Sequence, residues 1–464
     1  MRVIGRKEEI DELQRIYDSA SSEFVVVYGR RRVGKTFLVR EFFHDEFVFY
    51  ATGVARGSRK EQLAHFHNRL IRYGASDEDM VPFTWFEAFD RLETLCNKSK
   101  RDRKVVFLDE LPWMDTQKSE FLKALELFWN QWASARNDIV LVVCGSAASW
   151  MVNKVINSRG GLHNRLTCKI KLLPFTLSET KEYLESQKIK WDNLSIAESY
   201  MVLGGIPYYL HLLDKSRSLA QNIDRLFFSE SALLKDEFNN LYNSLFSKSE
   251  DYIRIVETLS KKKSGFTRDE IVKGSKLSNG GGLTRKLKSL EECGFIRKYK
   301  AIGDVSYTYQ LSDFFTLFYF QFLRDGKYSD SATWMHLQST SVCNVWRGLA
   351  FERLCFAHLP KIKQKLGISG ILTHTYSYYS SKAQVDMVIE RADRAVTICE
   401  MKFSEQPYTI TKAEWNKIEN RLLVAREYFK RKTLFLTMIT TNGLVKNYYS
   451  INNIQQEITL NDLF

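Results

Sequence analysis

The sequence of 464 residues lacks several features that would each assign it to a particular class of protein. It has only six prolines, and its aromatic content is 13%, which together argue against a disordered or low-complexity chain. No apolar run approaches the roughly 18 residues that a membrane-spanning helix needs. The N-terminus leads directly into a charged segment, so no secretory signal is expected. We therefore expect a cytoplasmic protein of about two to four domains, with no membrane partner.

Paired cysteines are also missing from the sequence. The seven cysteines are an odd number and include no Cys-x-x-Cys pair. Several lie within apolar runs, where a cysteine serves as a small core residue. This pattern argues against a disulfide framework and a zinc-binding cysteine cluster, and it favours a reducing compartment.

Positive charge is in excess, but it is spread unevenly along the chain. Of the net +13, residues 250–300 carry +6 and residues 341–464 carry +6, against +3 for residues 1–249 and −2 for residues 301–340. A basic balance alone more often reflects solubility than nucleic-acid binding. Its concentration in two segments that have other reasons to meet DNA favours contact with DNA phosphates.

The pattern Gly-x-x-x-x-Gly-Lys-[Ser/Thr] occurs at residues 29–36. Residues 24–28 before it read as a buried parallel strand, and residues 37–43 after it read as a helix, which is the context of a phosphate-binding loop. Lys35 would reach the β- and γ-phosphates of ATP, and the Thr36 hydroxyl would ligate Mg²⁺. The loop residues whose backbone amides would surround the phosphates are Gly29, Arg30, Arg31, Arg32, Val33, Gly34, Lys35 and Thr36.

A second part of the nucleotide site is expected after the apolar run at residues 105–108. Asp109 would hold Mg²⁺ through water, and Glu110 would orient the attacking water. A third apolar strand, at residues 139–145, ends at Ser146. In ATPases of the AAA+ type a polar side chain at this place senses the γ-phosphate, and an ordinary serine between strand and loop is the alternative.

Two arginines, Arg159 and Arg165, lie in the loop at residues 157–165. From this position, an arginine of a neighbouring subunit could neutralise the charge of the transition state, which would make the protein a homo-oligomer. An exposed loop arginine without a catalytic role is the alternative for each.

The following segments change in character along the chain. Residues 176–247 read as a helical lid, and residues 311–340 as an aromatic-rich helical connector. Between them, residues 250–310 predict three helices and a two-stranded wing, which is a winged helix. Its candidate recognition helix would bury leucines and turn Arg285, Lys286 and Lys288 outward to DNA phosphates. The alternative is an intramolecular lid whose basic face is solvated.

Residues 341–464 predict a helix, three strands, a helix and a further strand, the order of the PD-(D/E)XK nuclease core. Because strand side chains alternate, Glu400 and Lys402 share one face, and a hairpin places Asp386 beside Glu400. The two carboxylates could hold Mg²⁺ or Mn²⁺, with Glu352 as a further ligand. Lys402 could position the attacking water, so metal-activated hydroxide would cleave a phosphodiester.

The whole chain resembles prokaryotic AAA+-type, STAND-related ATPases that carry a C-terminal PD-(D/E)XK nuclease-like domain. The resemblance implies an α/β fold with a P-loop parallel sheet (1–175), a helical lid (176–247), a winged helix (250–310), a connector (311–340) and a restriction-endonuclease-like domain (341–464). It also favours Arg165 over Arg159 as the catalytic arginine. The matching pieces are Ile4-Gly5-Arg6, residues 29–36, Phe107-Leu108-Asp109-Glu110-Leu111-Pro112, Cys144-Gly145-Ser146, Leu173-Pro174-Phe175, Gly204-Gly205-Ile206-Pro207-Tyr208-Tyr209-Leu210, Phe351-Glu352, Val385-Asp386 and Glu400-Met401-Lys402.

Three functions are compatible with these motifs. The first is an ATP-hydrolysing enzyme that binds DNA and cleaves it with the C-terminal residues. The second is an ATP-dependent switch that binds DNA or a protein partner and cleaves nothing. The third is an assembly scaffold whose nucleotide is structural.

Overall fold

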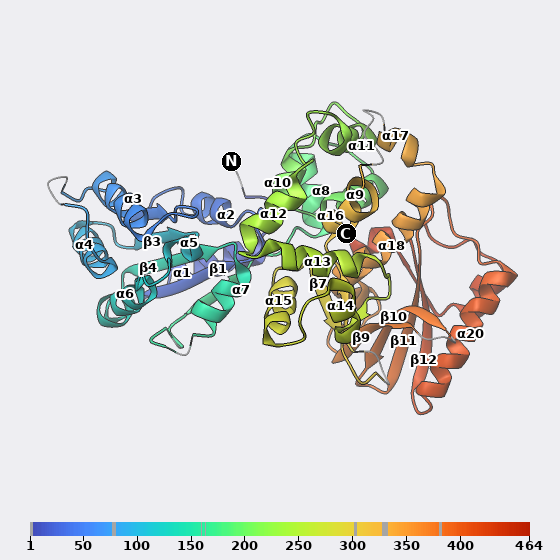
Figure 1. The fold of residues 1–464 in the computed structure, drawn as a ribbon. Helices are drawn as coiled ribbons and strands as arrows, with labels where there is room; N and C mark the ends of the chain where they lie inside the picture. Colours follow the sequence, from blue (N-terminus) through green and yellow to red (C-terminus); the bar gives the residue numbers. More distant parts are fainter. Residues whose placement is uncertain are drawn as a thin grey trace. The chain divides into compact units, whose positions relative to one another are not determined.

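The computed structural model divides into two compact units, Met1–Leu173 and Pro174–Phe464 (Figure 1). It describes residues 3–76, 80–158, 160–162, 164–300, 304–326, 333–379 and 383–464. The boundary between the units lies two residues before the expected end of the ATPase core at residue 175. Among the described helices, none is both long and apolar enough to cross a membrane.

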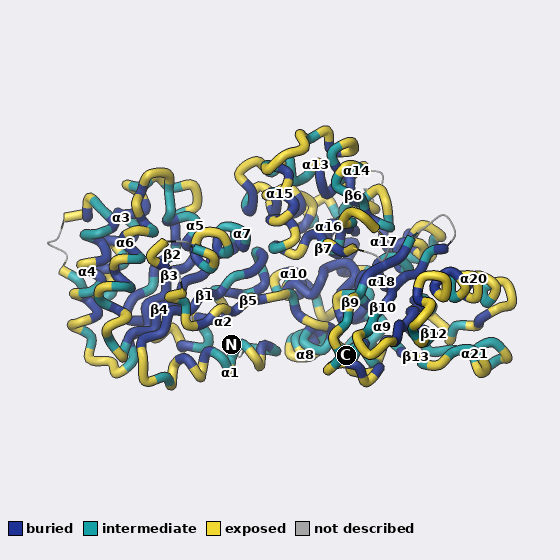
Figure 2. The backbone as a smooth tube through the Cα atoms, turned by 90° about the horizontal axis from the view of Figure 1, so that it is seen from below, coloured by how far each residue is buried: buried dark blue, intermediate teal, exposed yellow. Residues whose placement is uncertain are grey.

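The first unit contains a five-stranded parallel sheet in the order β2-β3-β4-β1-β5. Both β3 and β4 are buried along their whole length, which the apolar runs at residues 105–108 and 139–144 predict (Figure 2). Because β4 lies between β1 and β3, the loop after β1 and the carboxylates after β3 meet at one edge of the sheet. The strands are β1 (Glu23–Tyr28), β2 (Phe49–Thr52), β3 (Lys104–Asp109), β4 (Ile139–Gly145) and β5 (Cys168–Lys171).

Helices and one aromatic core complete the first unit. The core joins Phe66, Trp85, Phe121 and Phe128 to the apolar side chains of β3 and β4. The chain is α-helical from Phe121 to Leu127 and continues as a π-helical turn from Phe128 to Trp132. The helices are α1 (Lys7–Tyr17), α2 (Lys35–Phe42), α3 (Arg59–Arg72), α4 (Trp85–Lys98), α5 (Leu111–Met114), α6 (Phe121–Leu127), η1 (Phe128–Trp132), η2 (Ala133–Ala135), α7 (Ala148–Trp150) and η3 (Met151–Ile156).

The second unit begins with the helices expected as the lid. Gly205 has a φ of 64°, and its carbonyl accepts a hydrogen bond from the Phe175 N–H at 2.8 Å. A Cβ at Gly205 would lie 2.4 Å from the Phe175 carbonyl oxygen, so both backbone angle and space require glycine there. The helices are α8 (Leu177–Ser186), α9 (Asn193–Leu203), α10 (Pro207–His211), α11 (Leu219–Ile223), η4 (Asp224–Phe228) and α12 (Glu237–Leu245).

Residues 249–311, called here the 249–311 module, contain three helices and a small antiparallel sheet in the order β6-β8-β7. Strand β6 has only two residues and was not expected from the sequence. Leu283, Leu287 and Leu290 of the third helix are buried, as its apolar spacing predicts. The elements are α13 (Ser249–Ser260), β6 (Phe266–Thr267), α14 (Arg268–Ser275), α15 (Gly281–Glu292), β7 (Ile296–Tyr299) and β8 (Thr308–Leu311).

The aromatic side chains of the connector pack into a core that they share with Phe227 and Trp346. Phe315, Phe318 and Phe322 are buried, and Phe318 packs edge to face against Trp334 and Trp346. These rings are therefore not available as a base-stacking surface. The elements are α16 (Phe314–Phe318), η5 (Tyr319–Leu323) and α17 (Thr333–Leu337).

The C-terminal part contains a five-stranded mixed sheet in the order β13-β12-β11-β10-β9. Strands β9, β10 and β11 pair antiparallel, whereas β12 and β13 extend the sheet in parallel. The edge strand β13 was not expected, because it is short and half polar. The elements are α18 (Ser341–Ala357), α19 (Leu359–Lys365), β9 (Thr373–Tyr379), β10 (Gln384–Arg391), β11 (Ala395–Lys402), α20 (Lys412–Tyr428), β12 (Thr433–Thr440), α21 (Tyr448–Asn453), β13 (Gln456–Thr459) and η6 (Leu460–Leu463).

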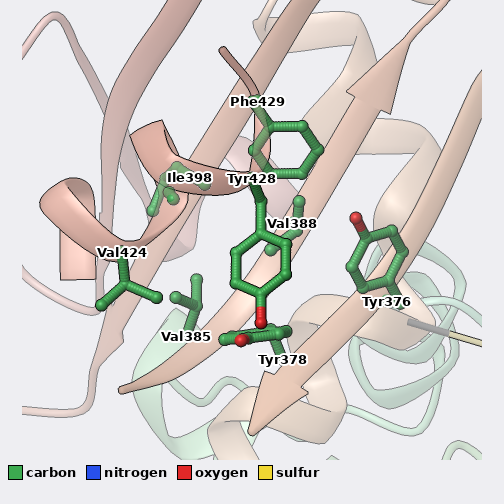
Figure 3. Close-up of a pocket in the computed structure, with 9 residues that line it drawn as sticks. Tyr376, Tyr378, Val385, Val388, Ile398, Val424, Tyr428 and Phe429 are labelled. Atoms are coloured by element: carbon green, nitrogen blue, oxygen red, sulfur yellow. The ribbon is translucent and has the colours of Figure 1, made fainter. Parts of the chain in front are cut away.

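Helix α20 packs on this sheet through apolar and aromatic side chains (Figure 3). Tyr428 meets Tyr378 of β9 edge to face, with ring centroids 5.4 Å apart. Val424 of the helix faces Val385 and Ile398 of the sheet in the same pocket. This packing fixes the helix, and with it Arg421, one turn before Val424.

All seven cysteines are buried thiols that form no disulfide with one another. Burial raises the pKa of the Cys96 thiol to about 12. The expectation of small core residues rather than disulfides is confirmed for every cysteine of the chain.

Candidate functional site

The loop between β1 and α2 is shaped by two glycines. Gly29 has a φ of 149°, and a Cβ there would lie 2.2 Å from the Leu172 carbonyl oxygen. Gly34, with a φ of 90°, precedes α2 without a side-chain cap, and a Cβ there would meet no atom of the described residues within 4 Å. The first backbone N–H groups of α2 therefore lie at an open helix end, which suits a phosphate.

Lys35 lies folded back over this loop. Its buried ammonium group donates hydrogen bonds to the carbonyl oxygens of Gly29 at 3.2 Å and Arg30 at 3.0 Å. Arg30 is buried, whereas Arg31 and Arg32 are half-buried. The lysine charge is thus held at the phosphate loop by neutral carbonyl groups, which a phosphate can replace.

Asp109 connects the loop to the end of β3. The Thr36 hydroxyl donates to Asp109 Oδ2 at 2.9 Å, and the Glu110 backbone N–H donates to Oδ1 at 2.9 Å. The Cys144 thiol of β4 donates to the same Oδ1 at 2.5 Å. Sequence reasoning placed Cys144 only in the core, because a cysteine within an apolar strand carries no sign of this contact.

Ser146 lies against Glu110. The serine hydroxyl is 2.8 Å from both carboxylate oxygens of Glu110, and the Ser146 N–H donates to Oε2 at 3.1 Å. Glu110 itself has a φ of 50°, so its backbone turns sharply at the end of β3. The structure thus brings the expected sensor and the expected catalytic carboxylate into direct contact.

Arg6 is a residue of this site to which sequence reasoning gave no role. Its buried guanidinium donates to the Leu173 carbonyl at 2.6 Å and to the Val33 carbonyl of the phosphate loop at 3.4 Å. Glu9 lies 3.6 Å from the same guanidinium. The signal was the segment Ile4-Gly5-Arg6, which matched the resembled family without showing what the arginine contacts.

Neither of the two loop arginines is among these contacts of the nucleotide site. Arg165 is exposed, and its N–H donates to the Leu162 carbonyl at 3.2 Å. Arg159 lies outside the described residues.

A second acidic centre lies at the ends of β10 and β11. Met387 pairs with Cys399, and Asp386 and Glu400 are the adjoining residues, so the hairpin brings the two carboxylates together. Asp386 Oδ2 accepts a hydrogen bond from the Met401 N–H at 3.1 Å. Glu400 is completely buried, and its Oε1 accepts no hydrogen bond from the described residues.

Cations of the chain surround Glu400. Arg421 of α20 hydrogen-bonds to Glu400 Oε2, and the Lys402 ammonium lies 4.0 Å from the same oxygen. Burial and the nearby Asp386 raise the pKa of Glu400 to about 8, against the opposing effect of Arg421 and Lys402. The buried Oε1 is an atom at which a further cation would be stabilised.

Glu352 differs from the sequence expectation. It is buried on α18, and its carboxylate hydrogen-bonds to Lys263 of the 249–311 module. Burial and Asp386 together raise the pKa of Glu352. Among the described residues, no group of three or more His, Cys, Asp or Glu side chains is arranged to hold a metal ion. The expected three-carboxylate set is therefore not assembled in this conformation, since Glu352 is bound by a lysine instead.

The basic helix α15 presents fewer free charges than its sequence suggests. Arg285 and Lys288 are exposed, but Lys286 is half-buried and pairs with Asp251 at 3.3 Å. Lys288 lies 3.7 Å from Glu292. Arg285 is thus the residue of this helix best placed to meet a phosphate from solution.

Comparisons with known proteins bear on the first unit and its continuation. A family model described as an ATPase domain found predominantly in Archaea matches residues 4–213. An uncharacterized protein of Methanocaldococcus jannaschii is 26% identical over 327 residues, which cover 69% of this chain and 68% of that protein. An uncharacterized ATP-binding protein of the same organism is 40% identical over 43 residues, 9% of this chain and 73% of that protein.

Among solved structures, the fold is similar to that of a Walker-type ATPase of Pyrococcus abyssi. The TM-score is 0.50 at 17% identity, and the alignment covers 69% of this chain and 96% of that chain. Together with the phosphate loop and the parallel sheet, these findings confirm the expected P-loop ATPase domain. Residues 4–213 of the chain thus match an ATPase domain.

Proposed function

We propose that this protein couples ATP binding and hydrolysis to the binding and metal-dependent cleavage of duplex DNA. The observation that carries the proposal is the chain of contacts from Thr36 through Asp109 to Glu110 and Ser146, beside an open helix end. These groups are arranged for a phosphate-bound Mg²⁺ and an attacking water.

Each residue of the nucleotide site has a role in this proposal. Lys35 binds the β- and γ-phosphates after leaving its carbonyl partners, and Thr36 and Asp109 hold Mg²⁺. Glu110 orients the water, and Ser146 holds the Glu110 carboxylate until the γ-phosphate is present. Arg165 is supplied to the site of a neighbouring subunit in a homo-oligomer.

DNA binding is assigned to the 249–311 module and the basic C-terminal part. The supporting observations are the exposed Arg285 and Lys288 on a helix whose opposite face is buried, and the excess charge of both segments. Such contacts position a duplex by its phosphates and carry no sequence preference.

Cleavage is assigned to Asp386, Glu400 and Lys402. A divalent cation bound by the two carboxylates would supply an activated hydroxide. Lys402 lies on the same face as Glu400 and positions the scissile phosphate or the water. The buried Glu400 Oε1, which accepts no hydrogen bond from the described residues, supports the cation.

A second function is an ATP-dependent switch that binds DNA or a protein partner and cleaves nothing. The observation that favours it is the pairing of Glu352 with Lys263 and of Glu400 with Arg421, which gives each of these two glutamates a cationic partner without a metal. In this function the C-terminal part is a binding module.

The two functions are separated by incubating the full chain with plasmid and linear duplex. Mg²⁺ or Mn²⁺ is added, with and without ATP, for the wild type, Lys402→Ala and the surface control Lys412→Ala. We expect cleavage that Lys402→Ala abolishes and Lys412→Ala retains, with ATP hydrolysis unchanged in both. Intact DNA under every condition, with ATP hydrolysis present, would leave the switch as the function.

A further inference from the structure

Lys263 brings a positive charge from the 249–311 module to the acidic centre. Its ammonium group hydrogen-bonds to Glu352 Oε1, although the two residues lie 89 positions apart in the sequence. The Glu352 side chain is 7% exposed, whereas that of Lys263 is 38% exposed. The lysine thus reaches from the surface to a buried carboxylate.

The backbone that carries Lys263 is fixed by side chains of neighbouring elements. Arg353 of α18 donates to the Lys263 carbonyl at 2.9 Å, and Gln310 of β8 donates to the same carbonyl at 2.6 Å. The Tyr299 hydroxyl donates to the adjacent Ser264 carbonyl at 2.9 Å. These hydrogen bonds fix the backbone of the turn beside the acidic centre. The flexible four-carbon side chain of Lys263 remains able to rotate into solvent.

The two buried glutamates of the acidic centre differ in how their negative charge is balanced. Glu400 uses one oxygen for Arg421 and Lys402, and its other oxygen is buried and accepts no hydrogen bond from the part of the chain that the structure describes. Glu352 has Lys263 as its partner, and this partner is the more exposed of the cations at the centre. A divalent cation prefers several carboxylate oxygens, so Glu352 is the ligand whose release would complete a set.

We propose that Lys263 competes with a divalent cation for Glu352, so that the acidic centre takes up its metal only when this side chain turns away. The inference rests on the proposed metal-dependent cleavage and specifies how that site is controlled. A DNA phosphate offers the ammonium group another anion, so binding of the substrate favours release of Glu352. Uptake of the metal is thereby linked to the presence of the strand to be cut.

The test is a titration of the nucleotide-free full chain with Mn²⁺, followed by electron paramagnetic resonance of the free ion. Lys263→Met removes the charge and keeps the length of the side chain. Lys262→Met is the matched control, because Lys262 lies in the same turn but pairs with Glu270 at 2.8 Å. Asp386→Asn identifies the Mn²⁺ that binds at the acidic centre.

We expect Lys263→Met to tighten the Asp386-dependent Mn²⁺ binding about tenfold, the change that follows when one charge-assisted hydrogen bond to a carboxylate is removed. Lys262→Met should stay within about twofold of the wild type, as expected for an exposed pair. Lys263→Arg, which keeps the charge, should bind Mn²⁺ like the wild type.

Equal affinity of wild type and Lys263→Met, with binding that Asp386→Asn still abolishes, would overturn the competition and leave the proposed cleavage site intact. Absence of Asp386-dependent Mn²⁺ binding from both proteins would remove the metal centre itself, and the competition with it.

Discussion

The two acidic sites of this protein hold their carboxylates in different ways. In the nucleotide site, Asp109 accepts hydrogen bonds from the Thr36 hydroxyl, the Cys144 thiol and a backbone N–H. Glu110 accepts them from the Ser146 hydroxyl and N–H. All of these donors are neutral, so the carboxylates are oriented while their negative charge is kept for a cation.

In the acidic centre of the second unit, the two glutamates have cations as partners, whereas Asp386 accepts a hydrogen bond from the Met401 N–H. Arg421 binds Glu400, and Lys263 binds Glu352. A cation satisfies a buried carboxylate more strongly than a neutral donor does, but it also neutralises the charge that a metal would use. The carboxylates of the first site therefore keep their charge for a cationic ligand, whereas the glutamates of the second site are already paired with cations of the chain.

The largest effect is expected when Arg421, the cation that hydrogen-bonds to Glu400 in the second site, is removed. Because the pKa of Glu400 is raised to about 8, the comparison is made above that pH, where the carboxylate is ionised. Arg421→Met then leaves Lys402, at 4.0 Å, as the nearest cation among the described residues, and breaking such a pair costs about 3–5 kcal/mol. The opening free energy of β11, measured by hydrogen exchange and mass spectrometry, should fall by this amount. The exposed Arg426 of the same helix provides the control Arg426→Met. Equal exchange in both variants would show that Arg421 does not hold Glu400.

In the first site, neutralising a carboxylate should impair chemistry and spare stability. Glu110→Gln keeps an oxygen for the Ser146 hydroxyl but cannot orient the water as a carboxylate does. We expect phosphate release from ATP to fall about 10²–10³-fold, a typical effect of losing one preorganised catalytic group. Nucleotide affinity and melting temperature should stay at the wild-type level.

The control for that measurement is Glu120→Gln, because Glu120 is exposed and pairs with Lys123 at 3.0 Å. ATP hydrolysis by Glu110→Gln at the wild-type rate would remove Glu110 from the mechanism and, with it, the distinction between the two sites.

The smallest effect is expected for the basic side chains of α15, and it is an effect on duplex binding. Arg285→Ala should weaken duplex binding a few-fold and lower the salt slope of the binding constant by about one. Lys286→Ala should change the slope less, since Lys286 already pairs with Asp251. Fluorescence anisotropy at several salt concentrations measures both. Identical slopes for the wild type and Arg285→Ala would place the duplex elsewhere.

Local sequence patterns predicted much of the first unit and its site. The phosphate loop was readable because its glycines, Lys35 and Thr36 lie within eight consecutive residues, and the buried strands because apolar runs mark parallel sheets. That Thr36 meets Asp109 follows from parallel strands ending at one edge. The contact of Cys144 with Asp109 was not readable, since it depends on β4 lying between β1 and β3.

In the second unit, the pairing of strands placed Asp386 beside Glu400 from sequence alone. The partner of Glu352 could not be predicted, because Lys263 is one of three consecutive lysines and lies 89 positions away. Only the turn held by Arg353 and Gln310 singles it out. Arg421 likewise required the packing of α20 on the sheet, which apolar spacing in the helix indicates too weakly.

The buried cysteines can serve as probes of local opening in each unit. Cys96, Cys144 and Cys168 belong to the first unit, and Cys293, Cys343, Cys355 and Cys399 to the second. A thiol held from solvent reacts with an alkylating reagent only after the segment around it opens. The cysteines that become alkylated therefore show which unit opens more readily when a nucleotide, a metal or DNA is added.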